Sequence, residues 1–182
     1  MRTTTVIIPA AGIGARLNGA ERKAWVSLGG RPLLSYALEA FRAHPAVREI
    51  ILAVAPEDME RARALLAAGP PRVTETAVCG GAERRDSVWQ GLQAMSAGTE
   101  VVLVHDAARP FVSRRAIDAC LAAVRTCGAA VVARPITDTV ISERSRPSRS
   151  QWAASASSLR GTSSMGAVRL DSSAYWATSR KV

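Results

Sequence analysis

The stretch that decides the fold runs from residue 6 to residue 16 and reads Val6-Ile7-Ile8-Pro9-Ala10-Ala11-Gly12-Ile13-Gly14-Ala15-Arg16. A short continuous apolar run is followed by a loop of small residues that carries a cation. Apolar runs of this length suit a strand that is covered on both faces. Small residues let a backbone approach a ligand closely, and turned N–H groups can bind phosphate oxygens. The stretch therefore predicts a buried strand that ends at an anion site.

The same alternation continues along the chain to about residue 140. Apolar runs alternate with stretches of helical spacing, as in Met59, Ala62 and Leu66. This pattern predicts an α/β domain of three layers, a parallel sheet with helices on both sides, and ligands of such sheets bind beyond the carboxyl ends of the strands. The predicted strands are residues 6–8, 50–54, 73–78 (a weaker run), 101–104 and 129–133. The predicted helices cover residues 33–41, 59–66, 88–95 and 117–124.

Length and composition exclude several classes of protein. The 182 residues suit one domain, and no apolar run approaches the length of a membrane span or of a signal-peptide core. Cys79, Cys120 and Cys127 form no CxxC pair, so they are expected to be reduced, mostly buried thiols of a cytoplasmic protein. His44 and His105 lie far from each other and from any cysteine pair, which speaks against a zinc site.

The pattern changes near residue 142. Residues 1–141 contain 5 serines and residues 142–182 contain 12, and the second range shows no clear period. We therefore expect the α/β domain at 1–141 and a divergent, Ser/Arg-rich tail at 142–182 with the composition of a disordered segment. The net charge is +9, but no aromatic residues are interleaved with the basic ones, so nucleic acid is not the expected partner.

The loop after the first strand matches neither of the two common phosphate-binding motifs. A dinucleotide fingerprint requires a glycine where Leu17 stands, and a P-loop requires Gly-Lys-Ser/Thr. The loop carries Arg16, and Lys23 is the single lysine among the first 142 residues, which contain sixteen arginines. A compact ammonium suits a phosphate. A nucleotide triphosphate site is the functional interpretation, and a tight turn with surface charges is the alternative.

Further polar motifs follow two later strands. Gly80-Gly81-Ala82 leads into a helix that holds Ser87, whose hydroxyl can bind a ligand, or the motif is an ordinary helix entry. Asp106 ends a buried strand, where it can hold Mg²⁺ between phosphates, and Arg109 can meet a second phosphate. An Asp106–Arg109 salt bridge that shapes the turn is the alternative. His105 is expected to be a structural hydrogen-bonding residue rather than a base.

Together with Asp138-Thr139, these motifs resemble one family in order and spacing. They resemble the 2-C-methyl-D-erythritol 4-phosphate cytidylyltransferases of the non-mevalonate pathway to isoprenoid precursors, over residues 5 to about 140. Ribitol-5-phosphate cytidylyltransferases share most of the motifs and remain an alternative, as does a truncated relative that binds CTP without efficient turnover. Nucleotidyltransferases that use UTP, GTP or ATP usually have a Gly-x-Gly-Thr-Arg loop, and Ile13-Gly14-Ala15-Arg16 lacks the threonine.

The resemblance implies a nucleotidyltransferase domain of the Rossmann-like, three-layer α/β class with a mostly parallel sheet. It also implies roles for individual residues. Arg16 and Lys23 are the implied catalytic residues, which stabilise the charge of the triphosphate. The implied cofactor is Mg²⁺, served by Asp106, and the implied substrates are CTP and a small sugar-alcohol phosphate. The residues implied to bind the substrates are Ala10, Ala11, Gly12 and Gly14 around the nucleotide, Gly81, Ala82 and Ser87 at cytosine and ribose, Asp106 and Ala107 at the nucleotide, and Arg109 and Thr139 at the acceptor.

The chain departs from the family pattern at three places. Arg22 stands where the family usually has a proline before the lysine, and Trp25 replaces the common Phe or Tyr. After Thr139 the arm motifs and the last active-site segment of the family are not recognisable, although the family's homodimer is built by exchanging that arm. Our hypothesis is a shift of reading frame near residues 141–146 or a degraded gene, which sequencing the DNA tests.

Overall fold

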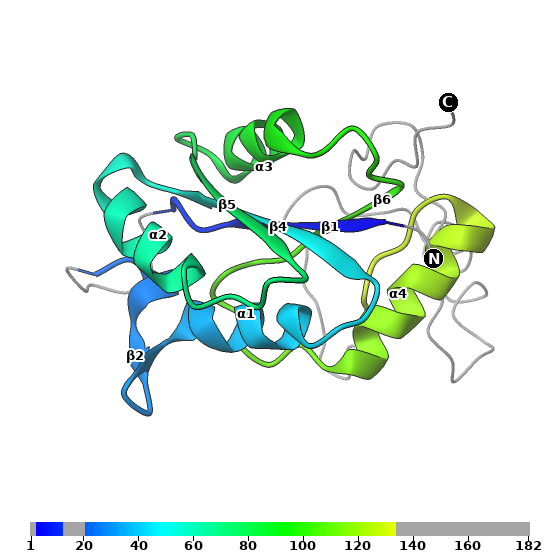
Figure 1. The fold of residues 1–182 in the computed structure, drawn as a ribbon, viewed down its shortest axis with the longest axis horizontal. Coiled ribbons are helices and arrows are strands. Elements are labelled where there is room, and N and C mark those ends of the chain that lie inside the picture. Colours follow the sequence, from blue (N-terminus) through cyan, green and yellow to red (C-terminus); the bar gives the residue numbers. More distant parts are fainter. Residues whose placement is uncertain (1–2, 13–20, 134–182) are drawn as a thin grey trace, which may run out of the picture.

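The computed structural model describes residues 3–12 and 21–133, and its centre is a parallel sheet (Figure 1). The strands follow the order β5-β4-β1-β6, and every neighbouring pair is parallel. Parallel strands need crossover connections, which the helices between them supply. The strands are β1 (Thr4–Pro9), β4 (Val47–Val54), β5 (Thr74–Cys79) and β6 (Val101–Val104).

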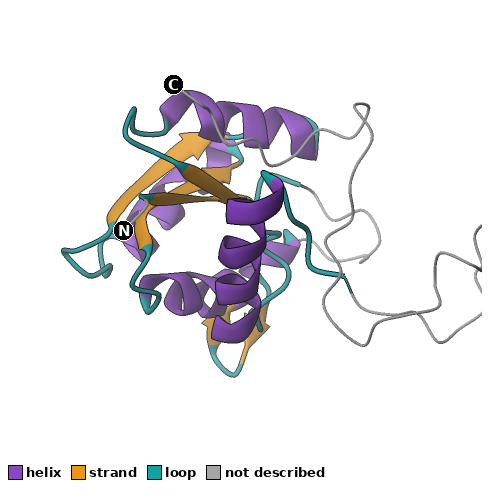
Figure 2. Ribbon diagram, turned by 90° about the vertical axis from the view of Figure 1, so that its right-hand side faces the viewer, coloured by secondary structure: helices purple, strands orange, loops and turns teal. Residues whose placement is uncertain are grey.

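Within the described residues, four helices cover the two faces of this sheet (Figure 2). One face packs against α1, α2 and α4 in a single apolar core, and α3 covers the other face. The predicted three-layer α/β class is therefore confirmed. The helices are α1 (Leu33–Arg42), α2 (Met59–Leu66), α3 (Arg84–Ala94) and α4 (Arg114–Cys127), with short 3₁₀ turns at η1 (Lys23–Trp25) and η2 (Pro56–Asp58).

The burial of β1 on both faces explains why the stretch from Val6 to Ile8 determines the fold. Val6 and Ile8 face the core of α1 and α4, whereas Ile7 points to the opposite face. There, a Cβ on Gly91 of α3 would lie 2.5 Å from the Ile7 Cγ2 atom, so only glycine permits this approach of helix and sheet. All three side chains of the apolar run are fully buried, as expected for a strand covered on both faces.

A small hairpin precedes α1. Its strands β2 (Ser27–Leu28) and β3 (Arg31–Pro32) are antiparallel and joined by Gly29 and Gly30. Both glycines have positive φ angles, 58° and 80°, as a two-residue hairpin turn requires. Pro32 then precedes the first residue of α1, close to the helix start that the sequence predicts.

The structure corrects the predictions for one strand, for the buried face of one helix and for the cysteines. The predicted strand at 129–133 is wrong: these residues form no strand, and Val131 and Val132 are exposed. An apolar run becomes a strand only where a neighbour pairs with its backbone, and within the described ranges β6 pairs with β1 alone. Helix α3 begins at Arg84 and holds Ser87 in its first turns, as predicted, but it buries Gly91 rather than Leu92.

The cysteine prediction is only half right. All three cysteines are free thiols, but Cys79 and Cys127 are exposed and Cys120 is partly buried. Cys79 ends the edge strand β5, and Cys127 lies in the last turn of α4, so neither faces the core. No helix within the described ranges is long and apolar enough to cross a membrane.

Candidate functional site

The predicted site residues converge at the carboxyl edge of the sheet, between β1 and β6. The chain leaves β1 towards β4 on one side, and β6 lies on the other side of β1. Two loops therefore diverge at this point and leave a crevice, as in other open α/β sheets. The first loop starts after Pro9, and the second starts after Val104.

A hollow of about 220 Å³ lies at this edge, and most of its walls come from the predicted motifs. Ala10, Ala11 and Gly12 form the wall after β1, and Asp106 with Ala107 forms the wall after β6. Lys23 contributes the ammonium. The complete lining is Pro9, Ala10, Ala11, Gly12, Lys23, Ala24, Arg84, Ser87, Asp106, Ala107 and Ala108.

The first loop continues the direction of β1 for one residue. The Ala10 N–H donates to the Ala53 carbonyl oxygen at 2.7 Å, which fixes where the chain turns away from the sheet. A Cβ on Gly12 would meet nothing within 4 Å, so the described residues leave open space beside its backbone. That space suits a ligand that approaches the loop closely. Gly14 and Arg16 lie outside the described residues.

The second wall is held by a buried serine. The backbone of Gly81 donates to the Ser87 Oγ atom at 3.1 Å, and Ser87 is only 2% exposed. A Cβ on Gly80 would lie 2.6 Å from the Ala11 Cβ atom, so glycine lets the loop after β5 pack against the loop after β1. These contacts give Ser87 and Gly80 a role in shaping the hollow. Contacts of Ser87, Gly81 and Ala82 with cytosine or ribose stay a prediction.

The turn after β6 is closed by its own backbone and by His105. The Arg109 N–H donates to the Asp106 carbonyl oxygen at 3.0 Å, and the His105 Nε2 atom lies 2.9 Å from the Arg109 carbonyl oxygen. A carbonyl oxygen can only accept, so Nε2 carries the proton. Burial lowers the pKa of His105, which keeps the imidazole neutral near pH 7. The geometry agrees with the expected structural role of His105.

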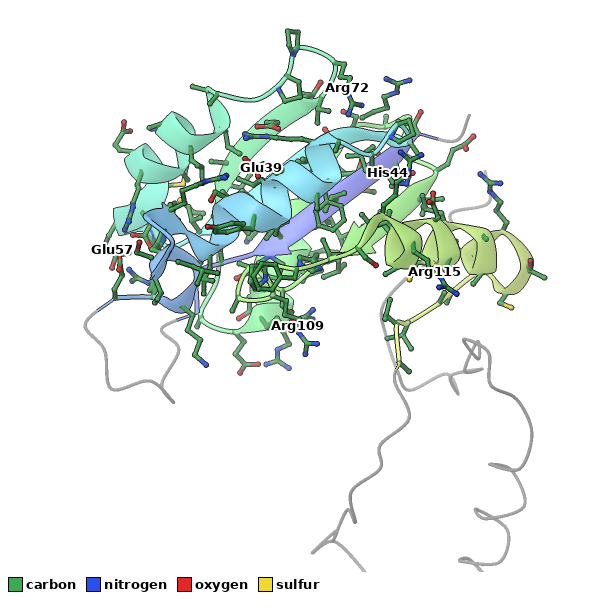
Figure 3. All side chains as sticks on the ribbon, turned by 90° about the horizontal axis from the view of Figure 1, so that it is seen from below. Glu39, His44, Glu57, Arg72, Arg109 and Arg115 are labelled. Atoms are coloured by element: carbon green, nitrogen blue, oxygen red, sulfur yellow. The ribbon has the colours of Figure 1, made fainter. Side chains whose placement is uncertain are left out.

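Two arginines surround the Asp106 carboxylate. Arg84 Nε lies 2.7 Å from Asp106 Oδ1, and Arg109 Nε lies 3.2 Å from Asp106 Oδ2. The Asp106–Arg109 bridge that the sequence offered as an alternative is therefore present. Arg109 is 78% exposed and points away from the fold (Figure 3), where a second ligand could reach it.

Arg84 is the residue that sequence reasoning missed. It is the first residue of α3, lines the hollow and neutralises Asp106 from the side opposite Arg109. The sequence could have indicated this role, because Arg84 follows Gly80-Gly81-Ala82-Glu83 at the start of a predicted helix. A cation there adds to the positive field that helix N-termini offer to anions.

The predicted residues divide into three groups. Those that line the hollow are Ala10, Ala11, Gly12, Lys23, Ser87, Asp106 and Ala107. Those that lie near it without lining it are Gly81, Ala82 and Arg109. Those outside the described residues are Gly14, Arg16 and Thr139. The hollow thus combines a small-residue loop, cations and one carboxylate, a set that suits a polyphosphate with a divalent cation.

The donor set fits Mg²⁺ carried by phosphates better than a metal held by protein alone. Within residues 3–12 and 21–133, no group of three or more His, Cys, Asp or Glu side chains could hold a metal ion. Mg²⁺ is typically bound through one or two carboxylates together with substrate phosphates. Asp106 is the carboxylate on the wall of the hollow, so it can provide such a ligand.

The family model for 2-C-methyl-D-erythritol 4-phosphate cytidylyltransferase matches residues 4–148. The chain belongs to this family. A cytidylyltransferase of that name from Bacillus velezensis is 42% identical over 135 residues, which are 74% of this chain and 58% of the relative. This family member shares its fold with the solved 4-diphosphocytidyl-2C-methyl-D-erythritol synthase from Anaerococcus prevotii, with a TM-score of 0.67 and 29% identity over 76% of this chain and 58% of that one.

A second solved relative agrees. The 2-C-methyl-D-erythritol 4-phosphate cytidylyltransferase from Thermus thermophilus has a TM-score of 0.57 and 37% identity, over 79% of this chain and 60% of that one. The family member described here therefore spans about three fifths of the length of these relatives. The resemblance inferred from the motifs is confirmed at the level of family and fold.

Proposed function

We propose that the chain transfers CMP from CTP to 2-C-methyl-D-erythritol 4-phosphate with release of pyrophosphate, in the non-mevalonate route to isoprenoid precursors. The observation that carries the proposal is the hollow at the carboxyl edge of the sheet, between β1 and β6. Lys23 and Asp106 line this hollow together with the loop of Ala10, Ala11 and Gly12. Membership of the family supports the choice of this reaction over transfer to ribitol 5-phosphate.

The reaction needs positioning and charge neutralisation rather than a strong base. An oxygen of the acceptor phosphate attacks the α-phosphorus of CTP in line, the bond from that phosphorus to the bridging oxygen breaks, and pyrophosphate leaves with the electron pair. The acceptor oxygen is already anionic, which agrees with a neutral His105 that is engaged with a carbonyl. Preorganised cations stabilise the charge that develops on the phosphates.

The proposed roles follow the walls of the hollow. Lys23, together with Arg16, stabilises the triphosphate, and the small residues from Ala10 to Gly14 wrap it. Gly81, Ala82 and Ser87 receive cytosine and ribose, and Ala107 lies on the ribose side. Arg109 and Thr139 hold the acceptor phosphate.

Mg²⁺ is the proposed cofactor. Asp106 would hold it, and the metal would neutralise charge on the phosphates when bound. Arg84 and Arg109 pair with the two carboxylate oxygens, so the Asp106 side chain is oriented before a metal arrives. The three free thiols agree with a reducing cytoplasm, which we propose as the location. The family implies a homodimer built by exchanging an arm, and because the arm motifs are not recognisable after Thr139, the dimer is not part of the proposal.

A pyrophosphate-release assay tests the proposal. The chain is offered CTP, UTP, GTP or ATP with methylerythritol phosphate or ribitol phosphate, with and without Mg²⁺. Release that requires CTP, methylerythritol phosphate and Mg²⁺ supports it. Release with ribitol phosphate alone would replace the acceptor, and CTP binding without release would indicate a relative that keeps the nucleotide site only.

A further inference from the structure

The segment that carries Lys23 is tied to a distant part of the chain by side chains on both sides of the lysine. Before it, Arg22 Nη1 lies 3.2 Å from Asp58 Oδ2, and Arg22 Nη2 lies 3.4 Å from Glu57 Oε2. Figure 3 shows Glu57 beside the ribbon of this segment. We call the set of these contacting residues the clamp. Its members are Glu21, Arg22 and Trp25 on one side and Glu57, Asp58 and Arg61 on the other.

The other half of the clamp centres on Arg61 of α2. Its Nη1 atom lies 2.7 Å from Glu21 Oε1, and its guanidinium stacks 4.5 Å from the centre of the Trp25 ring. Trp25 is itself only 2% exposed, so the ring is fixed between the core and this cation. Residues 21, 22 and 25 are therefore all anchored to the segment 57–61, and Lys23 lies between the anchors.

The backbone between the anchors is a single tight turn. The Trp25 N–H donates to the Arg22 carbonyl oxygen at 2.9 Å, and the Val26 N–H donates to the Lys23 carbonyl oxygen at 3.3 Å. A turn of this length has little stability of its own, because 3₁₀ hydrogen bonds have poor geometry. The position of the Lys23 ammonium at the hollow thus depends on what holds the ends of the turn.

Global stability is a weak explanation for the clamp. Glu57 is 69% exposed, and Arg61 and Glu21 are 48% exposed each, and ion pairs at such sites add little to folding. Only the Arg22–Asp58 pair is well covered, with exposed fractions of 24% and 14%. The covered pair is the one that adjoins Lys23, where precise placement matters for catalysis.

We propose that Arg22 is a positioning residue for Lys23, and that its ion pairs with Glu57 and Asp58 hold the lysine turn at the rim of the nucleotide hollow. The effect on nucleotide binding rests on the proposed function, whereas the effect on the turn does not. The Arg22 backbone has φ −63° and ψ 140°, which a proline ring also adopts. Arg22→Pro therefore removes the ion pairs while it stiffens the same backbone.

Hydrogen exchange tests the clamp without reference to any ligand. In Arg22→Ala, we expect the amides of Trp25 and Val26 to exchange about two- to fivefold faster, the range that loss of such ion pairs supports. Asp58→Asn should act in the same direction from the other partner. Arg63→Ala is the matched control, because Arg63 pairs with Glu60 within α2 and does not reach the lysine turn. Unchanged exchange at Trp25 and Val26 in both clamp variants would overturn the proposal.

Titration with CTP and Mg²⁺ on the same proteins connects the turn to the site. Arg22→Ala should bind CTP about two- to fivefold more weakly, and Arg22→Pro should bind it as the unaltered chain does. The unaltered chain and these two Arg22 variants should have the same Tm. Faster exchange with unaltered affinity in Arg22→Ala, or no recovery in Arg22→Pro, would overturn the positioning role. Failure of the unaltered chain to bind CTP would instead overturn the proposed function, and the exchange result would still decide whether the clamp holds the turn.

Discussion

The Lys23 turn and the turn from His105 to Arg109 carry charge to the same hollow, but they are held in different ways. The His105 turn is closed within five residues, by the bond from the Arg109 N–H to the Asp106 carbonyl oxygen and by the half-buried imidazole. The Lys23 turn buries Ala24 and Trp25 in the core and is also anchored through Arg22 and Arg61 to residues more than thirty positions away. The backbone of one turn is thus closed by neutral local hydrogen bonds, whereas the other turn adds long-range ion pairs to its packing.

This difference separates what each region can contribute to catalysis. The His105 turn presents Asp106 paired with Arg109, whose side chain is largely exposed. The lysine turn presents an ammonium whose backbone is supported by the buried Ala24 and Trp25 and by ion pairs that are partly exposed. Ion pairs at exposed sites weaken with salt, and hydrogen bonds between neutral groups are much less sensitive to it. The two walls should therefore respond differently to mutation, pH and ionic strength.

The largest effect is expected at Lys23 itself. Lys23→Ala removes a preorganised donor for phosphate charge, and such donors contribute about 2.7–4 kcal/mol to the transition state. The rate of pyrophosphate release should fall about a hundredfold or more, while the Tm stays within about 2 °C. Arg63→Ala is the control of equal charge change and should keep the full rate. A loss of less than tenfold in Lys23→Ala would remove Lys23 from the catalytic residues.

Asp106→Asn should have the next largest effect. The amide keeps the shape of the side chain but loses the charge that pairs with two arginines and that the proposed Mg²⁺ would need. Charge-assisted hydrogen bonds contribute about 1.5–3 kcal/mol, so Mg²⁺-dependent CTP affinity should fall about 10- to 100-fold. Titration with CTP in Mg²⁺ and in EDTA measures this. Equal losses under both conditions would show that Asp106 serves the fold of the turn and not the metal.

His105→Ala should loosen the turn after β6. It removes the hydrogen bond to the Arg109 carbonyl and the edge-on contact with Phe41, whose ring centre lies 5.1 Å away. A net hydrogen bond contributes about 0.5–1.5 kcal/mol, and urea unfolding should report a loss of at least that size. His105→Gln, which can still donate, should recover part of it. A loss in His105→Gln as large as in His105→Ala would argue that packing alone matters.

The stability should also depend on pH through His105. Burial lowers its pKa in the folded chain below the ordinary value of 6.5. The unfolded chain therefore binds this proton first as the pH falls, so the stability is complete above about pH 6.5 and declines as the pH falls through the folded pKa. Urea unfolding between pH 5 and 8 should show this decline, and His105→Gln should flatten it. The same slope in both proteins would assign it to another group.

Salt should produce the smallest effect and the sharpest contrast between the walls. Raising the salt from 0.1 M to 1 M shortens the screening length from about 10 Å to about 3 Å. Exposed ion pairs contribute about 0.2–1 kcal/mol, so exchange at the amides of Trp25 and Val26 should rise about 1.4- to fivefold. The Arg109 amide, which bonds to a backbone oxygen, should not change. Equal changes at both turns would mean that the two walls are held alike.

Much of this architecture can be predicted from the sequence because it is local or strongly patterned. The run from Val6 to Ile8 is apolar on both faces, and the middle of the sheet buries both faces. Asp106 and Lys23 each follow a short sequence motif at the end of a strand or loop, and the sheet brings both residues to the hollow between β1 and β6. The same reasoning failed at 129–133, where no strand lies beside the apolar run within the part of the chain that the structure describes, because composition does not say which backbone will pair.

The support of Lys23 could not be predicted for a different reason. Glu57 and Asp58 look like ordinary first-turn acids ahead of α2, and Arg22 looks like a surface cation. Only the packing of α2 beside β5 and β4 brings the two segments together, and no periodicity encodes a pair of ions 36 positions apart. Arg84 is an intermediate case, since its motif was visible but its carboxylate partner lies 22 positions away.

The central claim is that the hollow between β1 and β6 binds CTP through Lys23 and Asp106. Calorimetric titration with each of the four nucleoside triphosphates in Mg²⁺ tests it most directly. The account predicts that CTP binds at least about tenfold more tightly than the other three, a difference of about 1.4 kcal/mol, and that Lys23→Ala and Asp106→Asn both weaken it. Binding that does not distinguish CTP from ATP, GTP and UTP, or that both variants retain in full, would contradict it.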